Sequence, residues 1–177
     1  MIDIRHVYQT FGDRHILKDV SLSIKDGETM VILGASGSGK STLLKLIIGL
    51  LRPTSGKVLV NGKDMGQLSE EEMNEERRSM GMVFQYSALF DSLNVKENVA
   101  FGLRMHTRLS EEEIDAIVKE KLHLVGLDGI EDLMPANLSG GMKKRVSLAR
   151  AIALEPKIIL YDEPTAGLDP IRSTDIS

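Results

Sequence analysis

The residues best suited to chemistry form a short glycine-rich stretch that ends in a lysine and a serine. Its members are Gly34, Ala35, Ser36, Gly37, Ser38, Gly39, Lys40 and Ser41, with Thr42 directly after them. Glycines let successive backbone N–H groups point inward together, a geometry that side chains obstruct. In such a loop the lysine neutralises the β and γ phosphates of a nucleotide and the serine hydroxyl binds Mg²⁺. The pattern predicts that residues 34–42 bind the phosphates of ATP.

Two acids follow a short apolar run later in the chain. Residues 157–161 read Lys-Ile-Ile-Leu-Tyr, and Asp162 and Glu163 come next. The run is typical of a buried strand, and ligands of parallel α/β sheets bind at the carboxyl ends of strands. We expect Asp162 to hold Mg²⁺ through water and Glu163 to polarise the attacking water. Alone, the two acids fit an ordinary loop start equally well; beside the phosphate loop they indicate hydrolysis.

A second segment offers backbone donors to an anion. Leu138 is followed by Ser139, Gly140, Gly141 and Met142, and the next residues have helical apolar spacing. A serine and glycines at the positive end of a helix leave N–H groups for a phosphate. One chain then carries two half-sites, which predicts a nucleotide held between two copies. The alternative is a helix that Ser139 merely caps.

The elements that must position these residues are readable from apolar spacing. Residues 29–33 predict a strand buried on both faces that leads into the glycines. Leucines and isoleucines at helical spacing follow from Leu43 to Leu51, and Pro53 is expected to stop that helix. Residues 57–60 predict a strand that enters a tight turn at Asn61-Gly62.

The middle of the chain is predicted to be helical. Ser69 with Glu72, and Ser110 with Glu113, have the spacing of capping boxes. After Ser110 one helical face is apolar apart from a lysine, and it comprises Ile114, Ile117, Val118, Lys121, Leu122 and Val125. This face is expected to pack in a core.

Composition bounds the function further. The chain has 177 residues, a length typical of one domain, and no cysteine, which excludes disulfides, zinc–thiolate clusters and thiol nucleophiles. Its net charge of −4 gives no electrostatic reason to expect nucleic acid as a partner. The absence of cysteine fits a reducing compartment, so the cytoplasm is the default expectation. The N-terminus lacks the pattern of a secretory signal.

With these motifs in hand, the chain resembles the nucleotide-binding subunits of ABC transporters over its whole length. The family's signature reads LSGGQ, and Met142 stands here in the last position. The resemblance implies that Phe11 stacks on adenine and that Gln85 senses Mg²⁺ and the permease. It also matches Gly167-Leu168-Asp169 to the loop that crosses the dimer seam.

The resemblance implies an α/β fold of the P-loop NTPase kind, with a RecA-like core sheet. An N-terminal antiparallel β subdomain and the phosphate-loop core would occupy about residues 1–85, a helical signature subdomain about 86–150, and the Walker B strand and seam loop 157–170. It further implies head-to-tail dimers that hold ATP and Mg²⁺, and an integral-membrane permease as partner. The expected location is then the cytoplasmic face of the inner membrane.

A narrower resemblance links the chain to the Mla and Mce-associated ATPases of phospholipid transport, which adds a lipid-binding protein as a possible partner. It rests on segments at 84–90, 98–107, 133–135 and 151–154 and on Met142, whereas Gly102 stands where proline is expected. Arg104 and His106 in these segments are either permease contacts or surface residues. An ATPase for another small solute remains the alternative.

The resemblance also implies that the family continues beyond the position of Ser177 and that its switch histidine follows the loop at Asp169. The four histidines here all precede Asp162, so none of them matches the switch histidine. We therefore expect a C-terminally truncated chain with weak activity. Two other classes stay open: a non-catalytic ATP-binding fragment, and a soluble ABC ATPase acting on DNA or ribosomes. The absence of sustained heptads between Gly39 and Ser139 disfavours the DNA-repair members, and the single cassette disfavours the ribosomal ones.

Overall fold

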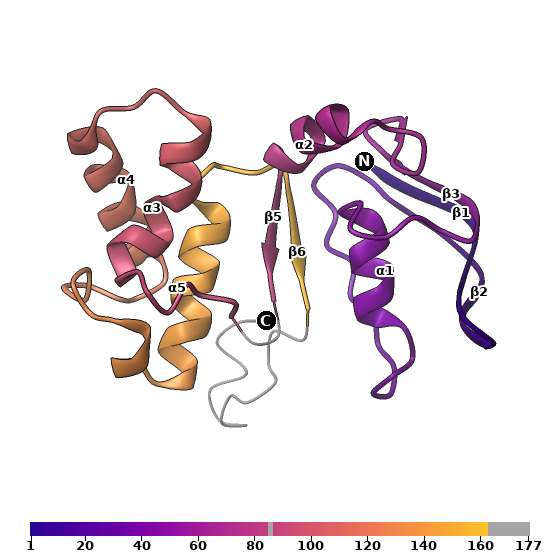
Figure 1. The fold of residues 1–177 in the computed structure, drawn as a ribbon, viewed down its shortest axis with the longest axis horizontal. Helices are drawn as coiled ribbons and strands as arrows, with labels where there is room; N and C mark the ends of the chain where they lie inside the picture. Colours follow the sequence, from indigo (N-terminus) through magenta and orange to yellow (C-terminus); the bar gives the residue numbers. More distant parts are fainter. Residues whose placement is uncertain (85–86, 163–177) are drawn as a thin grey trace. The chain divides into compact units, whose positions relative to one another are not determined.

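The computed structural model describes residues 1–84 and 87–162, which fall into two compact units (Figure 1). The first unit spans Met1–Arg77 and the second begins at Arg78. Each unit is described by itself. Gln85, Glu163 and the seam loop Gly167–Asp169 lie outside the described residues.

The first unit is built on an antiparallel sheet with the strand order β2-β1-β3-β4. Its strands are β1 (Ile2–Phe11), β2 (Arg14–Ile24), β3 (Ser55–Val60) and β4 (Lys63–Asp64). A two-residue turn at Asn61-Gly62 joins the last two, both with positive φ (51° and 83°), as a hairpin turn of this kind requires. The predicted strand and tight turn are therefore confirmed.

Two helices complete this unit, α1 (Lys40–Ile47) and α2 (Glu70–Arg78). The helix predicted after the phosphate loop is present, but it ends before Leu50 and Leu51 rather than at Pro53. Gly49 breaks it with a φ of 74°, and a Cβ at this glycine would collide with the side chain of Met73. The predicted capping box is confirmed: Ser69 N–H donates to Glu72 Oε2 (2.9 Å) and Glu72 N–H to Ser69 Oγ (3.3 Å).

The strand predicted over residues 29–33 is wrong. None of the strand ladders among the described residues includes this segment, and its side chains are open, with Val31 73% and Leu33 88% exposed. A strand exists only through hydrogen bonds to a neighbouring strand, which an apolar run cannot supply by itself. Residues 29–33 thus have the composition of a buried strand but lack hydrogen bonds to a neighbouring strand among the described residues.

The second unit contains a parallel strand pair and a group of helices. The strands are β5 (Met80–Val83) and β6 (Ile158–Tyr161), and the helices are α3 (Val95–His106), α4 (Glu111–Leu124), the 3₁₀ turn η1 (Pro135–Asn137) and α5 (Gly140–Ile152). The strand predicted at 157–161 is present but not fully buried. Leu160 is buried, whereas Ile159 and Tyr161, which share the opposite face of the strand, are exposed.

The helices of this unit share one apolar core. Its buried members are Val95, Val99, Ala100, Leu103, Ile114, Val118, Leu122, Leu127, Leu138, Val146, Ala149 and Ala153. The predicted apolar face of α4 contributes to it, and the capping box of Ser110 and Glu113 is present. Lys121 is buried on that face and donates to the carboxylates of Glu120 (2.9 Å) and Glu155 (3.2 Å), which raises its pKa. No helix within residues 1–84 and 87–162 is long and apolar enough to cross a membrane.

Candidate functional site

The phosphate loop adopts a conformation that its glycines make possible. Gly37 and Gly39 have φ of 77° and 97°, in the region that side chains rarely adopt. A Cβ on Gly39 would lie 2.7 Å from Leu17 Cδ2, and one on Gly34 would lie 2.6 Å from Ser38 Oγ. Glycine is therefore needed at Gly39 for two reasons, its φ and the close approach of β2.

Lys40 lies across this loop. Its ammonium donates to the carbonyl oxygens of Gly34 (2.8 Å) and Ala35 (3.0 Å). The loop is tightened further where Ser38 N–H donates to the Ala35 carbonyl (3.2 Å). The predicted phosphate ligands are thus brought together in one exposed turn, and the lysine charge sits on that turn.

The start of α1 is formed by a glycine and carries no acid. Gly39 is its N-cap and provides no side-chain cap, and the first turn carries no acid. The first N–H groups of a helix lack intrahelical acceptors and carry partial positive charge. Ser41 and Thr42 are half-buried in this first turn. The combination of glycine loop, lysine and uncapped helix start is suited to a polyphosphate.

Phe11 ends β1 at the hairpin that joins β1 to β2. It pairs with Arg14 across a two-residue turn, and Gly12 in that turn has a φ of 55°. The phenyl ring is 46% exposed, so it is accessible to a planar ligand. Stacking on adenine stays a prediction.

The second predicted anion site begins α5. Ser139 is the N-cap, and its Oγ accepts a hydrogen bond from Met142 N–H (3.2 Å). The hydroxyl keeps its own hydrogen as a donor. Met142, which departs from the family's signature, packs against the apolar core of the second unit. An apolar residue at this position therefore supports the helix, and the exposed Ser139 and Gly140 remain in place.

Asp162 follows β6, as predicted, and is only 7% exposed. Its backbone N–H donates to the Val83 carbonyl (3.0 Å), so it continues the ladder past the end of the strand. Carboxylate and hydroxyl oxygens are ligands that Mg²⁺ accepts, so Asp162 and Ser41 each carry a suitable donor atom. They belong to different units, and the other predicted residues, Gln85 and Glu163, lie outside the described residues.

Polar residues that the sequence analysis did not single out organise the chain beyond Gln85. Asn98 of α3 is fully buried (0% exposed) and accepts from Phe90 N–H (2.9 Å). Its amide donates to the carbonyls of Phe90 (3.1 Å), Leu93 (2.9 Å) and Asn94 (3.0 Å). The one signal in the sequence is an asparagine at an apolar position of a helix. Because Asn94 lies four positions earlier and caps the helix, both asparagines are easily attributed to a turn.

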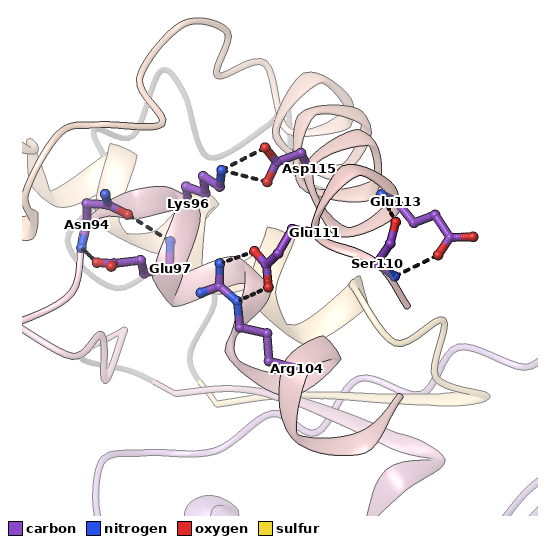
Figure 2. A network of polar contacts seen from close by, with 8 residues as sticks. All are labelled: Asn94, Lys96, Glu97, Arg104, Ser110, Glu111, Glu113 and Asp115. Carbon is purple, nitrogen blue, oxygen red and sulfur yellow. Dashed lines mark hydrogen bonds and ion pairs between the residues drawn. The ribbon is translucent and has the colours of Figure 1, made fainter. Parts of the chain in front are cut away.

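Figure 2 shows how charged residues join α3 to α4 in the second unit. Arg104 donates through two nitrogens to the Glu111 carboxylate (3.0 and 2.7 Å), which lowers the pKa of Glu111. Lys96 pairs with Asp115 between the same helices, with Nζ 2.6 Å from one carboxylate oxygen. Arg104 thus forms an ion pair within the second unit, and its contact with a permease stays a prediction.

Comparison with known proteins identifies the family of the chain. The family model described as "ABC transporter" matches residues 17–166. The chain is 50% identical over 98% of its length to the protein TRIGALACTOSYLDIACYLGLYCEROL 3, chloroplastic, of Arabidopsis thaliana, and covers 52% of that protein. It is 48% identical over 97% of its length to the intermembrane phospholipid transport system ATP-binding protein MlaF of Haemophilus influenzae, and covers 65% of it.

A solved structure matches the fold closely. The ATP-binding cassette MJ0796, solved as a dimer in a post-hydrolysis state bound to ADP and Pi, is 38% identical, with a TM-score of 0.92. That comparison covers 99% of this chain and 79% of the cassette. The chain spans about half the length of the first curated relatives that it matches. With the family model matched over most of its residues, the chain belongs to the ABC transporter family, and its fold is the P-loop α/β fold of ABC cassettes.

Proposed function

We propose that this protein is the ATP-binding subunit of an ABC transporter, which binds and hydrolyses ATP between two copies and so drives an integral-membrane permease. The observation that carries the proposal is the phosphate loop. Gly37 and Gly39 adopt positive φ in front of an uncapped helix start, and Lys40 lies across the turn. Backbone donors, helix dipole and ammonium converge there on one anion.

The residues of this chain divide the work as follows. Gly34 to Thr42 hold the phosphates, and Lys40 exchanges its loop carbonyls for phosphate oxygens when the nucleotide binds. Ser41 and Asp162, with Gln85, would hold Mg²⁺, which would neutralise charge on the transferred phosphoryl group. Glu163 accepts a hydrogen bond from the attacking water and orients it in line.

The second half of the site comes from the partner copy. Ser139 accepts from Met142 N–H and has its O–H left to donate, and Gly140 and Gly141 add backbone donors at the helix start. The dimeric state of the cassette MJ0796 with ADP and Pi supports this arrangement. Closure of the two copies over ATP, and reopening after hydrolysis, would move the permease through the region around Gln85.

Phospholipid is the transported substrate that we propose, because two relatives at nearly half identity are named for intermembrane phospholipid transport. The lipid-binding partner and the cytoplasmic face of the inner membrane belong to the same proposal. Another relative, at 50% identity, is named a probable ribonucleotide transport ATP-binding protein. Ribonucleotide is therefore the competing substrate.

Nucleotide binding and turnover by the purified protein test the core of the proposal. Lys40→Ala should reduce ATP affinity by about 10- to 100-fold, the value of one charge-assisted contact. Glu163→Gln should bind ATP like the parent, lose phosphate release, and accumulate as a dimer in size-exclusion chromatography with Mg²⁺ and ATP. Glu71→Gln, an exposed acid on α2, is the matched control. Parent-like phosphate release by Glu163→Gln would exclude the assigned role.

The substrate is tested separately with the copurified membrane partner in vesicles. Phospholipid should stimulate phosphate release or be moved between labelled vesicles, and a ribonucleotide should do neither. Stimulation by the ribonucleotide alone would replace lipid with that substrate and leave the ATPase assignment intact.

A further inference from the structure

The chain on both sides of Gln85 is held by the same end of helix α5. Before the glutamine, Gly81 of β5 lies so close to this end that a Cβ would be 2.5 Å from the Ala151 carbonyl oxygen. After the glutamine, the guanidinium of Arg150 donates to the carbonyls of Ser87 (3.1 Å) and Ala88 (2.9 Å). Figure 1 shows α5 beside β5 within the second unit.

The segment that Arg150 holds has an unfavourable backbone conformation. Ser87 and Ala88 have φ of 62° and 46°, and neither is a glycine. Consecutive residues of this kind persist only where the surrounding contacts impose them. Two nitrogens of one planar guanidinium each hold one of these carbonyls, and the single nitrogen of a lysine lacks this fixed two-point geometry.

Arg150 makes a third contact with the same segment. Its Cζ lies 5.8 Å from the centre of the Phe90 ring, and that ring lies 4.7 Å from the ring of Phe101 on α3. The buried amide of Asn98 fixes Phe90 from the other side through its N–H and carbonyl. Residues 87–90, which we call the post-glutamine segment, are therefore clamped between α5 and α3.

The other end of α5 carries the signature. Ser139 precedes Arg150 by eleven positions, about 16 Å along a helix that rises 1.5 Å per residue. We propose that Arg150 is a positioning residue that makes the signature helix and the post-glutamine segment move as one body. Displacement of Ser139 by nucleotide is then passed directly to the chain around Gln85. This inference rests on the proposed function, because it needs Ser139 and Gln85 to act on ATP and Mg²⁺.

A matched control lies on the same helix. Arg145 also donates to two loop carbonyls, those of Val125 (3.4 Å) and Gly126 (3.2 Å), which follow α4. Arg145 makes both bonds through one nitrogen, and Arg145→Lys alters this arginine contact of α5 without touching the post-glutamine segment. The pair Arg150→Lys and Arg145→Lys therefore separates this coupling from the general support of α5.

Hydrogen exchange tests the clamp without reference to activity. In Arg150→Lys we expect the amides of residues 87–94 to exchange about tenfold faster or more, with the rest of α5 unchanged. In Arg145→Lys the faster exchange should appear at 125–127 instead. Arg150→Lys with Ala88→Gly should recover part of the protection, because glycine adopts positive φ without penalty. Unchanged exchange at 87–94 in Arg150→Lys would overturn the proposal.

Turnover tests the transmission. Arg150→Lys should keep the parent affinity for ATP without Mg²⁺, lower kcat, and raise the Mg²⁺ concentration needed for half-maximal phosphate release by about threefold or more. Arg145→Lys should leave that concentration unchanged. In Arg150→Lys, kcat could fall only as much as the amount of folded protein measured by circular dichroism, with unchanged Mg²⁺ dependence. That result would show that Arg150 has a structural role alone and would overturn the proposed transmission. A parent protein without Mg²⁺-dependent turnover would refute the proposed function, whereas the exchange result would still decide the clamp.

Discussion

Helices α1 and α5 both begin at glycine-rich segments proposed to bind phosphate, yet their starts are built differently. At α1 the N-cap is Gly39 in a left-handed conformation with no side-chain cap. At α5 the N-cap is Ser139 in an extended conformation, and its oxygen already accepts from Met142 N–H. The first start depends on backbone shape, and the second on one hydroxyl.

This difference separates two ways of preparing an anion site. The loop before α1 has no side-chain cap and fixes its shape by packing Gly39 against Leu17 of β2. The start of α5 satisfies part of its donors within the chain and keeps one O–H hydrogen for the ligand. We expect the fold to tolerate no side chain at Gly39. We expect it to tolerate the loss of the Ser139 hydroxyl.

The largest effect is expected for Gly39→Ala. The new Cβ would meet Leu17 at 2.7 Å and Ile16 at 3.1 Å, at a φ of 97°. Strained φ and overpacking together should lower the free energy of unfolding by about 2–4 kcal/mol and abolish ATP binding. Thermal unfolding and nucleotide titration measure the two effects.

Gly37→Ala is the control for that substitution. Its φ of 77° carries the same kind of penalty, but a Cβ there meets nothing within 4 Å. A loss of about 1 kcal/mol in stability is expected. Equal losses for the two variants would show that packing against β2 contributes nothing to the loop.

A smaller effect is expected at the start of α5. Ser139→Ala should cost about 1 kcal/mol of stability through the lost cap, while Ser139→Gly should cost only a few tenths. Both remove the hydroxyl, so both should slow phosphate release equally if that hydroxyl contacts nucleotide. Chemical denaturation and turnover are measured on the same samples.

Ser110→Ala provides the matched control, because Ser110 caps α4 with the same geometry. It should lose similar stability and keep the parent turnover per folded molecule. Slower turnover in Ser110→Ala would mean that helix capping alone explains the result at Ser139.

The smallest effect is expected for an acidic residue in the first turn of a helix. Helix α4 carries such residues and α5 does not. Arg104 lowers the pKa of Glu111 in the folded chain. The carboxylate therefore stabilises the fold at pH values above its unfolded pKa, and this contribution disappears as pH falls through the lower folded pKa. Glu111→Gln should be slightly less stable than the parent at neutral pH and equal to it in acid, by urea unfolding at several pH values. A constant difference at every pH would exclude the ion pair as the cause.

Features that depend on residues close together in the sequence were predictable, whereas contacts between distant segments were not. The glycine loop, the capping boxes at Ser69 and Ser110 and the Asn61-Gly62 turn each depend on residues close together in the chain, and all are present. The strand at 29–33 failed because a strand needs a partner that its own residues do not specify. Arg150 escaped notice because its acceptors are backbone carbonyls, which every residue possesses.

The clamp at Arg150 also has a consequence for the order of folding. Its hydrogen bonds join residues 62 and 63 positions apart, so they close a long loop whose entropy must be lost before the contact forms. Such non-local contacts form after local helices and turns. We therefore expect the left-handed conformation of Ser87 and Ala88 to form late, when α5 docks, because a nascent chain that ends before Arg150 lacks the donor that holds it.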